Sequence, residues 1–547
     1  MSKNSKWDNI IKDIFLKKNT FLASTELIEL LCKEHGIKRD YARQVIKRAA
    51  DKKIIKSSDP LTFSKGQYVY MGPGDYLDLS TLIKITKIYK PPMYRVLSLL
   101  NKEDKIISYF EARKAAAVPI ENLDKYKLIQ IDKEIKELIK QNILFTVQDP
   151  EREIIYLAAK EYEADPVKLN GLMRRHFEKM HLDSLFLPDI VSWLKEHNFI
   201  THNQIVYRRI DNPSIGAKHN DFLWDAFTYT NTTGFSINTG KEDKQTLVVL
   251  DVLIHRKYSK EDLDGFYNRI QSVRHSTHGE ARKILPIIFF VEVDPDVKRE
   301  IKRLKLLNFS LQNIFGTKIT ELITQLDNIN TTLNKLVSTS AKDTQVVSVK
   351  VIGDVENSLK SMDDTGHIDN FQNLKGDLFE SLMYVIVLNL FPFAKRINHS
   401  KVLKPYEYDI IVEQDHEVIV IELKGFKSKT IIKLGDNKTK NTVKWFFGKT
   451  FPHTKTVIAT NNNSFGYNKS EIKACYITSA KFSDAANSFL QEQNATRLKP
   501  EEFDCFYDQE GLLNLVKTHK NLENIRNSTN FVYLLERYYL KKDISSE

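Results

Sequence analysis

Two acids and a lysine stand on neighbouring stretches of the chain that read as β-strands. Residues 406–426 have the sequence YEYDIIVEQDHEVIVIELKGF, with Asp409 in the first apolar run and Glu422 and Lys424 in the second. Because alternate residues of a strand share a face, Glu422 and Lys424 point the same way, and Asp409 can bring a second carboxylate beside them. Adjoining carboxylates repel each other unless a cation joins them, and Mg²⁺ (or Mn²⁺) prefers such hard oxygen ligands. A nearby lysine can orient a metal-bound water and stabilise charge on a phosphate, so the pattern favours phosphodiester hydrolysis. The alternative is a surface ion pair on an exposed edge strand.

The helix before these strands supports the first interpretation. NLKGDLFESLMYVIVLNLF is amphipathic and places Glu380 near a partly buried face. With this helix and strand order, the region resembles the PD-(D/E)XK, or restriction-endonuclease-like, nuclease superfamily, in its Mrr-like branch. The resemblance implies that Asp409, Glu422, Lys424 and Glu380 are catalytic, and that Asp409, Glu422 and Glu380 hold the metal.

The sequence departs from the family pattern in two places. Tyr408 stands where the family has a proline before the aspartate. The family's Gln or Lys on the following helix has no clean counterpart, since Lys438, Lys440 and Lys444 all fit. Downstream, KTVIATNNNSFGYNKSEIKACYIT looks like the family's strand, threonine-rich turn and helix. The departures leave the recognised base sequence undefined.

Residues 165–317 repeat the layout without the lysine. When LWDAFTYT and TLVVLDVLIHRK are set beside the later strands, Asp225 takes the place of Asp409 and Asp251 that of Glu422. Leu253 falls where Lys424 should be, and Glu178 loosely mirrors Glu380. The copy also resembles the superfamily, in a degenerate form that binds nucleic acid, dimerises or packs against the active domain. Two alternatives stay open, namely an unrelated α/β domain and an active site that recruits Lys257 or His255.

Two winged helices are predicted before these domains, in residues 1–77 and 78–160. Each has helical stretches followed by a hairpin-like pair of strands, IIKSSDPLTFSKGQYVYMG in the first and FTVQDPEREIIYLA in the second. The third helix of the first copy carries the predicted DNA-binding residues Arg39, Arg43, Lys47 and Arg48. Basic residues on such a helix can contact phosphates while the helix enters a major groove. The alternative is a protein-interaction module with a solvated charged face.

The chain as a whole is expected to be a multidomain α+β and α/β protein. Its 547 residues exceed what one core can hold, so three to five domains are expected. Beyond the segments already described, we predict a helical connector and linker at 318–368, the PD-(D/E)XK nuclease domain at 369–496 and a helical C-terminal tail at 497–547. Three widely spaced cysteines and no long apolar segment favour a cytoplasmic protein without a membrane partner.

Together these patterns predict a Mg²⁺-dependent DNA endonuclease of prokaryotic restriction or phage defence. The net charge of +11 is compatible with double-stranded DNA as the partner. A homodimer is expected because one phosphodiester site cuts one strand. Two alternatives stay open. One is a DNA-binding regulator or scaffold with structural nuclease folds, and the other is an effector nuclease that a protein partner or a ligand activates through the winged helices.

Overall fold

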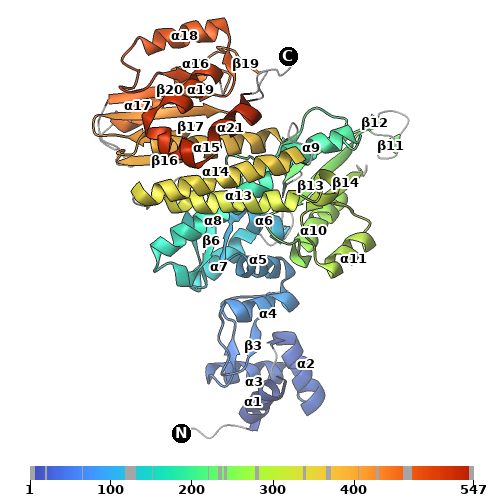
Figure 1. Cartoon of the computed structure of the whole chain (residues 1–547). Coiled ribbons are helices and arrows are strands. Elements are labelled where there is room, and N and C mark those ends of the chain that lie inside the picture. Colours follow the sequence, from blue (N-terminus) through green and yellow to red (C-terminus); the bar gives the residue numbers. More distant parts are fainter. Residues whose placement is uncertain are drawn as a thin grey trace. The chain divides into compact units, whose positions relative to one another are not determined.

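The structure, a computed structural model, describes most of the chain. The described residues are 6–18, 21–63, 66–117, 131–150, 152–219, 221–231, 237–238, 243–276, 283–336, 341–364, 371–403, 406–426, 430–440, 442–459 and 471–540. The chain is a mixed multidomain α+β protein and forms two compact units (Figure 1). Unit 1 comprises Met1–Ser184 and Asn198–Asn308, and unit 2 comprises Leu185–His197 and Phe309–Glu547. None of the described helices is both long enough and apolar enough to cross a bilayer.

The first module of unit 1, residues 6–77, follows the predicted element order. Its elements are α1 (Lys6–Lys18), β1 (Leu22–Ala23), α2 (Ser24–His35), α3 (Arg39–Asp51), β2 (Lys56–Ser57) and β3 (Val69–Met71), with the sheet order β1-β3-β2. Helix α2 ends at His35, and its C-cap is Gly36, whose φ of +67° suits glycine. Its N-cap is Ala23, whose backbone N–H donates to the Glu26 carboxylate at 2.9 Å.

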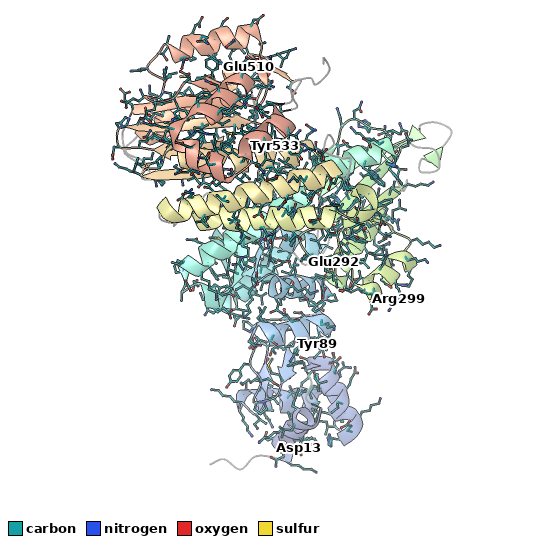
Figure 2. All side chains as sticks on the ribbon, in the orientation of Figure 1. Asp13, Tyr89, Glu292, Arg299, Glu510 and Tyr533 are labelled. Atoms are coloured by element: carbon teal, nitrogen blue, oxygen red, sulfur yellow. The ribbon has the colours of Figure 1, made fainter. Side chains whose placement is uncertain are left out.

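The second module, residues 79–162, repeats this order after an extra helix. Its elements are α4 (Leu79–Tyr89), α5 (Pro91–Lys102), β4 (Ile106–Ser108), α6 (Tyr109–Ala116), α7 (Ile131–Lys140), β5 (Leu144–Gln148) and β6 (Ile155–Ala159), with the sheet order β4-β6-β5. Tyr89 of α4, labelled in Figure 2, donates its hydroxyl to Glu26 and to the Phe21 carbonyl of the first module. Leu61 and Val69 of the first module share a buried apolar cluster with Leu97 of α5. The two modules are therefore joined by a continuous core.

A mixed α/β domain completes unit 1. Its main elements are α8 (Pro166–Leu185), β7 (Val206–Tyr207), the hairpin β8 (Ala217–His219) and β9 (Phe222–Trp224), β10 (Ala226–Thr230), β11 (Ile237–Asn238), β12 (Asp243–Lys244), β13 (Thr246–Leu253), α10 (Lys260–Ser276), β14 (Ile284–Phe290), α11 (Pro295–Arg303) and β15 (Leu307–Ser310). The sheet has the order β15-β14-β13-β10-β7. Strand β13 pairs antiparallel with β10 and parallel with β14, and it is buried along its whole length.

Unit 2 contains a second sheet with the same plan. Its elements are α15 (Gln372–Leu390), β16 (Arg396–Leu403), β17 (Tyr406–Glu413), β18 (Glu417–Lys424), β19 (Ile431–Ile432), α16 (Val443–Trp445), η3 (Phe446–Thr450), α17 (Phe451–Ala459), β20 (Glu471–Thr478), β21 (Lys481–Phe482), α18 (Asp484–Asn494) and β22 (Phe506–Tyr507). The main sheet has the order β16-β17-β18-β20-β22. Strand β18 pairs antiparallel with β17 and parallel with β20, so it corresponds to β13 of unit 1.

Three predicted segments differ from the structure. Residues 318–368, predicted as a helical connector and linker, contain two long helices, α13 (Ile319–Leu336) and α14 (Ala341–Asp364), which lie side by side in Figure 1. The C-terminal segment is mostly helical, with α19 (Gln509–Thr518), α20 (Glu523–Ser528) and α21 (Phe531–Leu534), yet β22 joins it to the main sheet. Helix α9 (Leu187–Glu196) belongs to unit 2, so residues 165–317 do not form one continuous body.

Replacing Leu359 with alanine tests whether α14 is part of the core. Leu359 is fully buried, so the substitution should lower the free energy of unfolding of unit 2 by about 2–5 kcal/mol. Asn357→Ala, at an exposed position of the same helix, should change it by less than about 0.5 kcal/mol. Urea unfolding followed by circular dichroism measures both, and equal stabilities would restore the linker interpretation.

Candidate active site

The predicted acids and lysine meet at the ends of two neighbouring strands. The Lys424 Nζ lies 2.8 Å from Glu422 Oε1 and 3.4 Å from Asp409 Oδ2. The three side chains are 19%, 12% and 15% exposed respectively, so the group is largely buried yet open to solvent on one side. We call this group the carboxylate–lysine site. The alternative of a freely exposed surface ion pair does not match this burial.

Backbone contacts hold the carboxylate–lysine site in place. Strands β17 and β18 pair regularly up to Ile410 and Ile421, and the next hydrogen bond is made by a side chain. The Leu423 N–H donates to Asp409 Oδ2 at 2.6 Å, which ties the aspartate to the strand that carries its partners. On the other side of β18, the Lys424 carbonyl accepts a hydrogen bond from the Thr478 hydroxyl of β20 at 2.8 Å. The spacing of acid and lysine is therefore fixed by the sheet.

A glycine lets helix α15 approach this strand end. A Cβ atom at Gly425 would lie 2.9 Å from both Cβ and Cγ of Phe379, closer than real Cβ atoms come to their neighbours. The close approach brings the next residue of α15, Glu380, within electrostatic reach of Asp409 and Lys424. Gly425 is thus required by packing as well as by the end of the strand. The site therefore includes the predicted helix glutamate.

The electrostatics of the site show an excess of negative charge. Burial raises the pKa of Glu422 to about 7, with Lys424 opposing and Asp409 adding to the shift. Burial and the Asp409 charge raise the pKa of Glu380 well above its usual range. Burial would lower the pKa of Lys424, but the surrounding carboxylates outweigh it and hold that pKa well above the usual value. Glu422 and Glu380 thus retain protons that a further cation would displace.

The donor set at this site fits a hard divalent cation. Asp409 and Glu422 present carboxylate oxygens to one shared point, and Mg²⁺ typically takes one or two carboxylates and keeps several waters. Within the described part of the chain, no three His, Cys, Asp or Glu side chains are arranged as a ready-made metal cage. The assignment of Glu380 as a third metal ligand stays a prediction. The charge excess at Asp409, Glu422 and Glu380 is the feature that matches a cation.

The surroundings of the site correct part of the sequence interpretation. Lys455–Ala459, expected to start a strand, lies in helix α17, and the strand that pairs with β18 is β20. The threonine-rich turn falls in 460–470, outside the described residues. Lys444 lies on α16, whereas Lys438 and Lys440 are exposed in the segment before it.

The sequence interpretation also missed Tyr476. This residue is fully buried on β20 and pairs in register with Glu422. Its hydroxyl has no hydrogen-bond partner among the described residues, and its pKa is raised by burial, with the charges of Lys424 and Glu422 also acting on it. Its position two residues before the end of β20 was the available signal, since it mirrors the position of Glu422 on β18.

The first copy reproduces the same acid pair. Asp225 stands immediately before β10, and the Val252 N–H donates to its Oδ2 at 2.8 Å, as the Leu423 N–H does to Asp409. This matching hydrogen bond aligns Asp251 with Glu422 and the buried Leu253 with Lys424, as the sequence predicted. Here, however, Asp225 is completely buried and the Asp251 side chain is only 2% exposed.

Neither residue proposed for recruitment reaches this pair. Lys257 pairs with Asp294 at 3.2 Å, and His255 pairs with Asp183 at 2.8 Å. Instead, Lys114 of α6 forms ion pairs with both Asp225 and Asp251. The acid of α8 that reaches the end of β13 is Asp183, which accepts from the Ile254 N–H at 2.7 Å, rather than Glu178.

The four predicted DNA-binding residues all lie exposed on α3, namely Arg39, Arg43, Lys47 and Arg48. The opposite face of this helix is buried through Val45 and Ala49. Arg43 makes an exposed ion pair with Asp40 at 3.2 Å, which contributes little to stability. The basic face of α3 is therefore open to a ligand.

Comparisons with known proteins give no match. No family model, no curated protein and no solved structure matches the chain.

Substituting Gly425 tests how closely α15 must approach the site. Gly425→Ala should lower the free energy of unfolding of unit 2 by about 1–3 kcal/mol, because the new methyl group overlaps Phe379. Combining it with Phe379→Leu should cost less than the sum of the two single changes. Gly376→Ala on the same helix is the matched control, since nothing lies within 4 Å of its Cβ. Chemical unfolding measures all four variants, and strict additivity at 425 and 379 would contradict the packing argument.

Proposed function

We propose that the protein is a divalent-metal-dependent endonuclease that hydrolyses phosphodiester bonds of double-stranded DNA. The observation that carries the proposal is the carboxylate–lysine site, in which Lys424 lies 2.8 Å from Glu422 and 3.4 Å from Asp409 on adjoining strands. The resemblance to PD-(D/E)XK nucleases in residue types supports it. The order of α15, the antiparallel strands β16–β18 and the parallel strand β20 supports it further.

Each residue of the site has a distinct role in this proposal. Asp409 and Glu422 would hold Mg²⁺ or Mn²⁺, which supplies a nucleophilic water at neutral pH and polarises the scissile phosphate when it is bound. Lys424 places a positive charge where the phosphate gains negative charge. Burial raises the pKa of Glu422 to about 7, so a bound cation would take the place of a proton there near neutral pH. Glu380, whose pKa is raised by burial and by the Asp409 charge, would lose its proton when a cation binds and then add to the attraction.

The basic face of α3 would bring the nuclease to its substrate. Arg39, Arg43 and Lys47 are spaced four residues apart, so they form one stripe along an exposed helix face. Such a stripe suits phosphate contacts from a helix in a major groove. We propose a role in prokaryotic restriction or phage defence in the cytoplasm, with a homodimer that cuts both strands.

Removing the lysine charge tests the catalytic assignment. Lys424→Ala should slow cleavage of supercoiled plasmid in Mg²⁺ on the order of 10²-fold or more, since one preorganised charge at the reacting phosphate is lost. Asp409→Asn should weaken Mn²⁺ binding, measured by calorimetry, because a charged ligand becomes neutral. DNA binding, followed by fluorescence anisotropy, should stay close to wild type in both.

The controls separate catalysis from folding. Lys433→Ala changes an exposed lysine of the same domain and should leave the cleavage rate unchanged. If Lys424→Ala nicks plasmid at the wild-type rate, Lys424 is not a catalytic residue. If the wild type never cuts DNA in Mg²⁺ or Mn²⁺, a regulator or a partner-activated effector becomes the better reading.

Reversing the charge of the α3 stripe tests DNA recognition. Replacing Arg39, Arg43 and Lys47 with Glu should weaken duplex binding and reduce the log–log salt slope by about 0.9 for each lost phosphate contact. The helix should persist, because Glu is a good helix former and the buried face is untouched. The matched control reverses three exposed basic residues of α11, Lys298, Arg299 and Lys302. If both triple variants weaken binding equally, the effect is one of net charge and α3 does not read DNA.

A further inference from the structure

The acid pair of the first α/β domain is neutralised by a lysine from another module. We propose that Asp225 and Asp251 form a closed cation site in which the ammonium of Lys114 takes the place of an ion. We further propose that this contact clasps the second module onto the α/β domain. Lys114 lies on α6 and ion-pairs with Asp225 and, at 3.1 Å, with Asp251. We call this arrangement the α6 clasp. It gives the first acid pair a role in assembly that is independent of catalysis.

The two acid pairs of the chain hold an ammonium in the same way. In unit 2, the Lys424 Nζ bridges Asp409 and Glu422, and in unit 1 the Lys114 Nζ bridges Asp225 and Asp251. The difference is the origin of the lysine. Lys424 comes from the strand that carries Glu422, whereas Lys114 comes from a helix 137 residues before Asp251 in the sequence, the difference between the two residue numbers. The first pair can therefore form its contact only when α6 is docked.

Both carboxylates of the α6 clasp have a second positively charged partner besides Lys114. Arg208 pairs with Asp225 at 3.2 Å, and Arg269 pairs with Asp251 at 2.9 Å. The Tyr258 hydroxyl donates to Asp251 Oδ2 at 2.7 Å. Burial would raise the pKa of Asp251, but the charges of Lys114 and Arg269 outweigh it and lower that pKa. Lys114, Arg208 and Arg269 thus bring three positive charges to two carboxylates, so the first pair needs no additional cation.

The backbone around α6 is shaped for this docking. A Cβ atom at Gly265 of α10 would lie 3.0 Å from the Ala115 carbonyl oxygen of α6. A Cβ atom at Gly216 would overlap the ring of Phe110 at 2.2 Å. Arg95 of α5 donates to the carbonyl oxygens at the C-terminal end of α6, at 2.6 Å to that of Ala115. Gly265 and Gly216 of the α/β domain leave space for α6, and Arg95 of the second module holds the end of that helix. Together these contacts allow Lys114 to reach the acids.

The α6 clasp connects the modules of unit 1 through continuous packed contacts. The first and second modules share one apolar core, and the clasp connects the second module to the sheet through β10 and β13. The basic face of α3 is thereby linked to the first α/β domain by packed contacts. Lys114 of α6 lies beside the first acid pair, whose side chains are only 0–2% exposed.

Substituting Lys114 tests the clasp in the full-length protein. Lys114→Met removes the ammonium and leaves buried carboxylates with fewer partners. Hydrogen–deuterium exchange of α6 and α10 should become roughly ten-fold faster or more, because a broken buried ion pair is strongly destabilising. The same exchange in α3 should change much less. Lys102→Met is the matched control, since Lys102 joins α5 to Glu261 of α10 at 2.6 Å but is 42% exposed. It should have a smaller effect.

A double variant distinguishes charge balance from simple loss of packing. Lys114→Met with Asp225→Asn removes one positive and one negative charge, while Arg208 keeps Asp183 at 3.7 Å. Its exchange in α6 and α10 should be no faster than that of Lys114→Met alone, which means that the two changes are coupled. If Lys114→Met fails to fold, folding of the double variant supports the proposal. Additive effects, or failure of both variants to fold while Lys102→Met folds, overturn it.

Metal titration tests the closed-site proposal independently of the exchange experiments. Mn²⁺ binding to wild type, followed by electron paramagnetic resonance, should be unchanged by Asp251→Asn, because Lys114 already occupies the first pair. Loss of a bound Mn²⁺ in that variant overturns the closed-site proposal. Absence of Mn²⁺ binding in every variant would count against the nuclease function and leave the exchange experiment to decide the clasp.

Discussion

Two carboxylates held side by side at the ends of adjacent strands repel each other, and both sheets of this chain balance that repulsion with an ammonium group. Each aspartate is locked by a backbone N–H of the next strand, from Val252 in unit 1 and from Leu423 in unit 2. The position of the acids is therefore dictated by the sheet and cannot relax away. A cation, or a proton retained as on Glu422, then stabilises such a pair in a low-dielectric setting.

The apolar character of β18 explains why the carboxylate–lysine site is so sharply defined. Residues Val418–Ile421 are buried, and this anchors the strand on both faces before Glu422 and Lys424 at its end. Gly425 then lets α15 approach the strand end, which brings Glu380 within electrostatic reach of Asp409. Burial is what makes the charges interact strongly, and it also raises the pKa of Glu422 to about 7. The packing that buries the site is thus also the cause of its electrostatic properties.

Contacts between residues close in the sequence could be predicted from it, whereas contacts between distant residues could not. Spacing of two between Glu422 and Lys424 on an apolar strand was sufficient to predict a shared face, and the exposed stripe on α3 followed from helical periodicity. Lys114 could not be predicted, because nothing local links it to Asp251. The linker part of the prediction for 318–368 missed a helical pattern, since Val351, Val355 and Leu359 recur at four-residue intervals and are all buried. Strand β22 has only Phe506 and Tyr507, too few residues for periodicity to identify.

The source of the lysine determines what each acid pair can do. A lysine two residues after the acid on the same strand lies within the sheet, and the group keeps 12–19% exposure on its open side. A lysine from α6 comes from outside the sheet, and the acids beside it are only 0–2% exposed. The two pairs share carboxylates and a bridging ammonium, yet only the pair of unit 2 keeps carboxylate side chains that are 12–15% exposed. Unit 1 has Leu253 at the position that corresponds to Lys424 of unit 2, and this difference therefore affects more than one charge. It transfers the neutralising group to another module, and the acid pair then stabilises the assembly of unit 1.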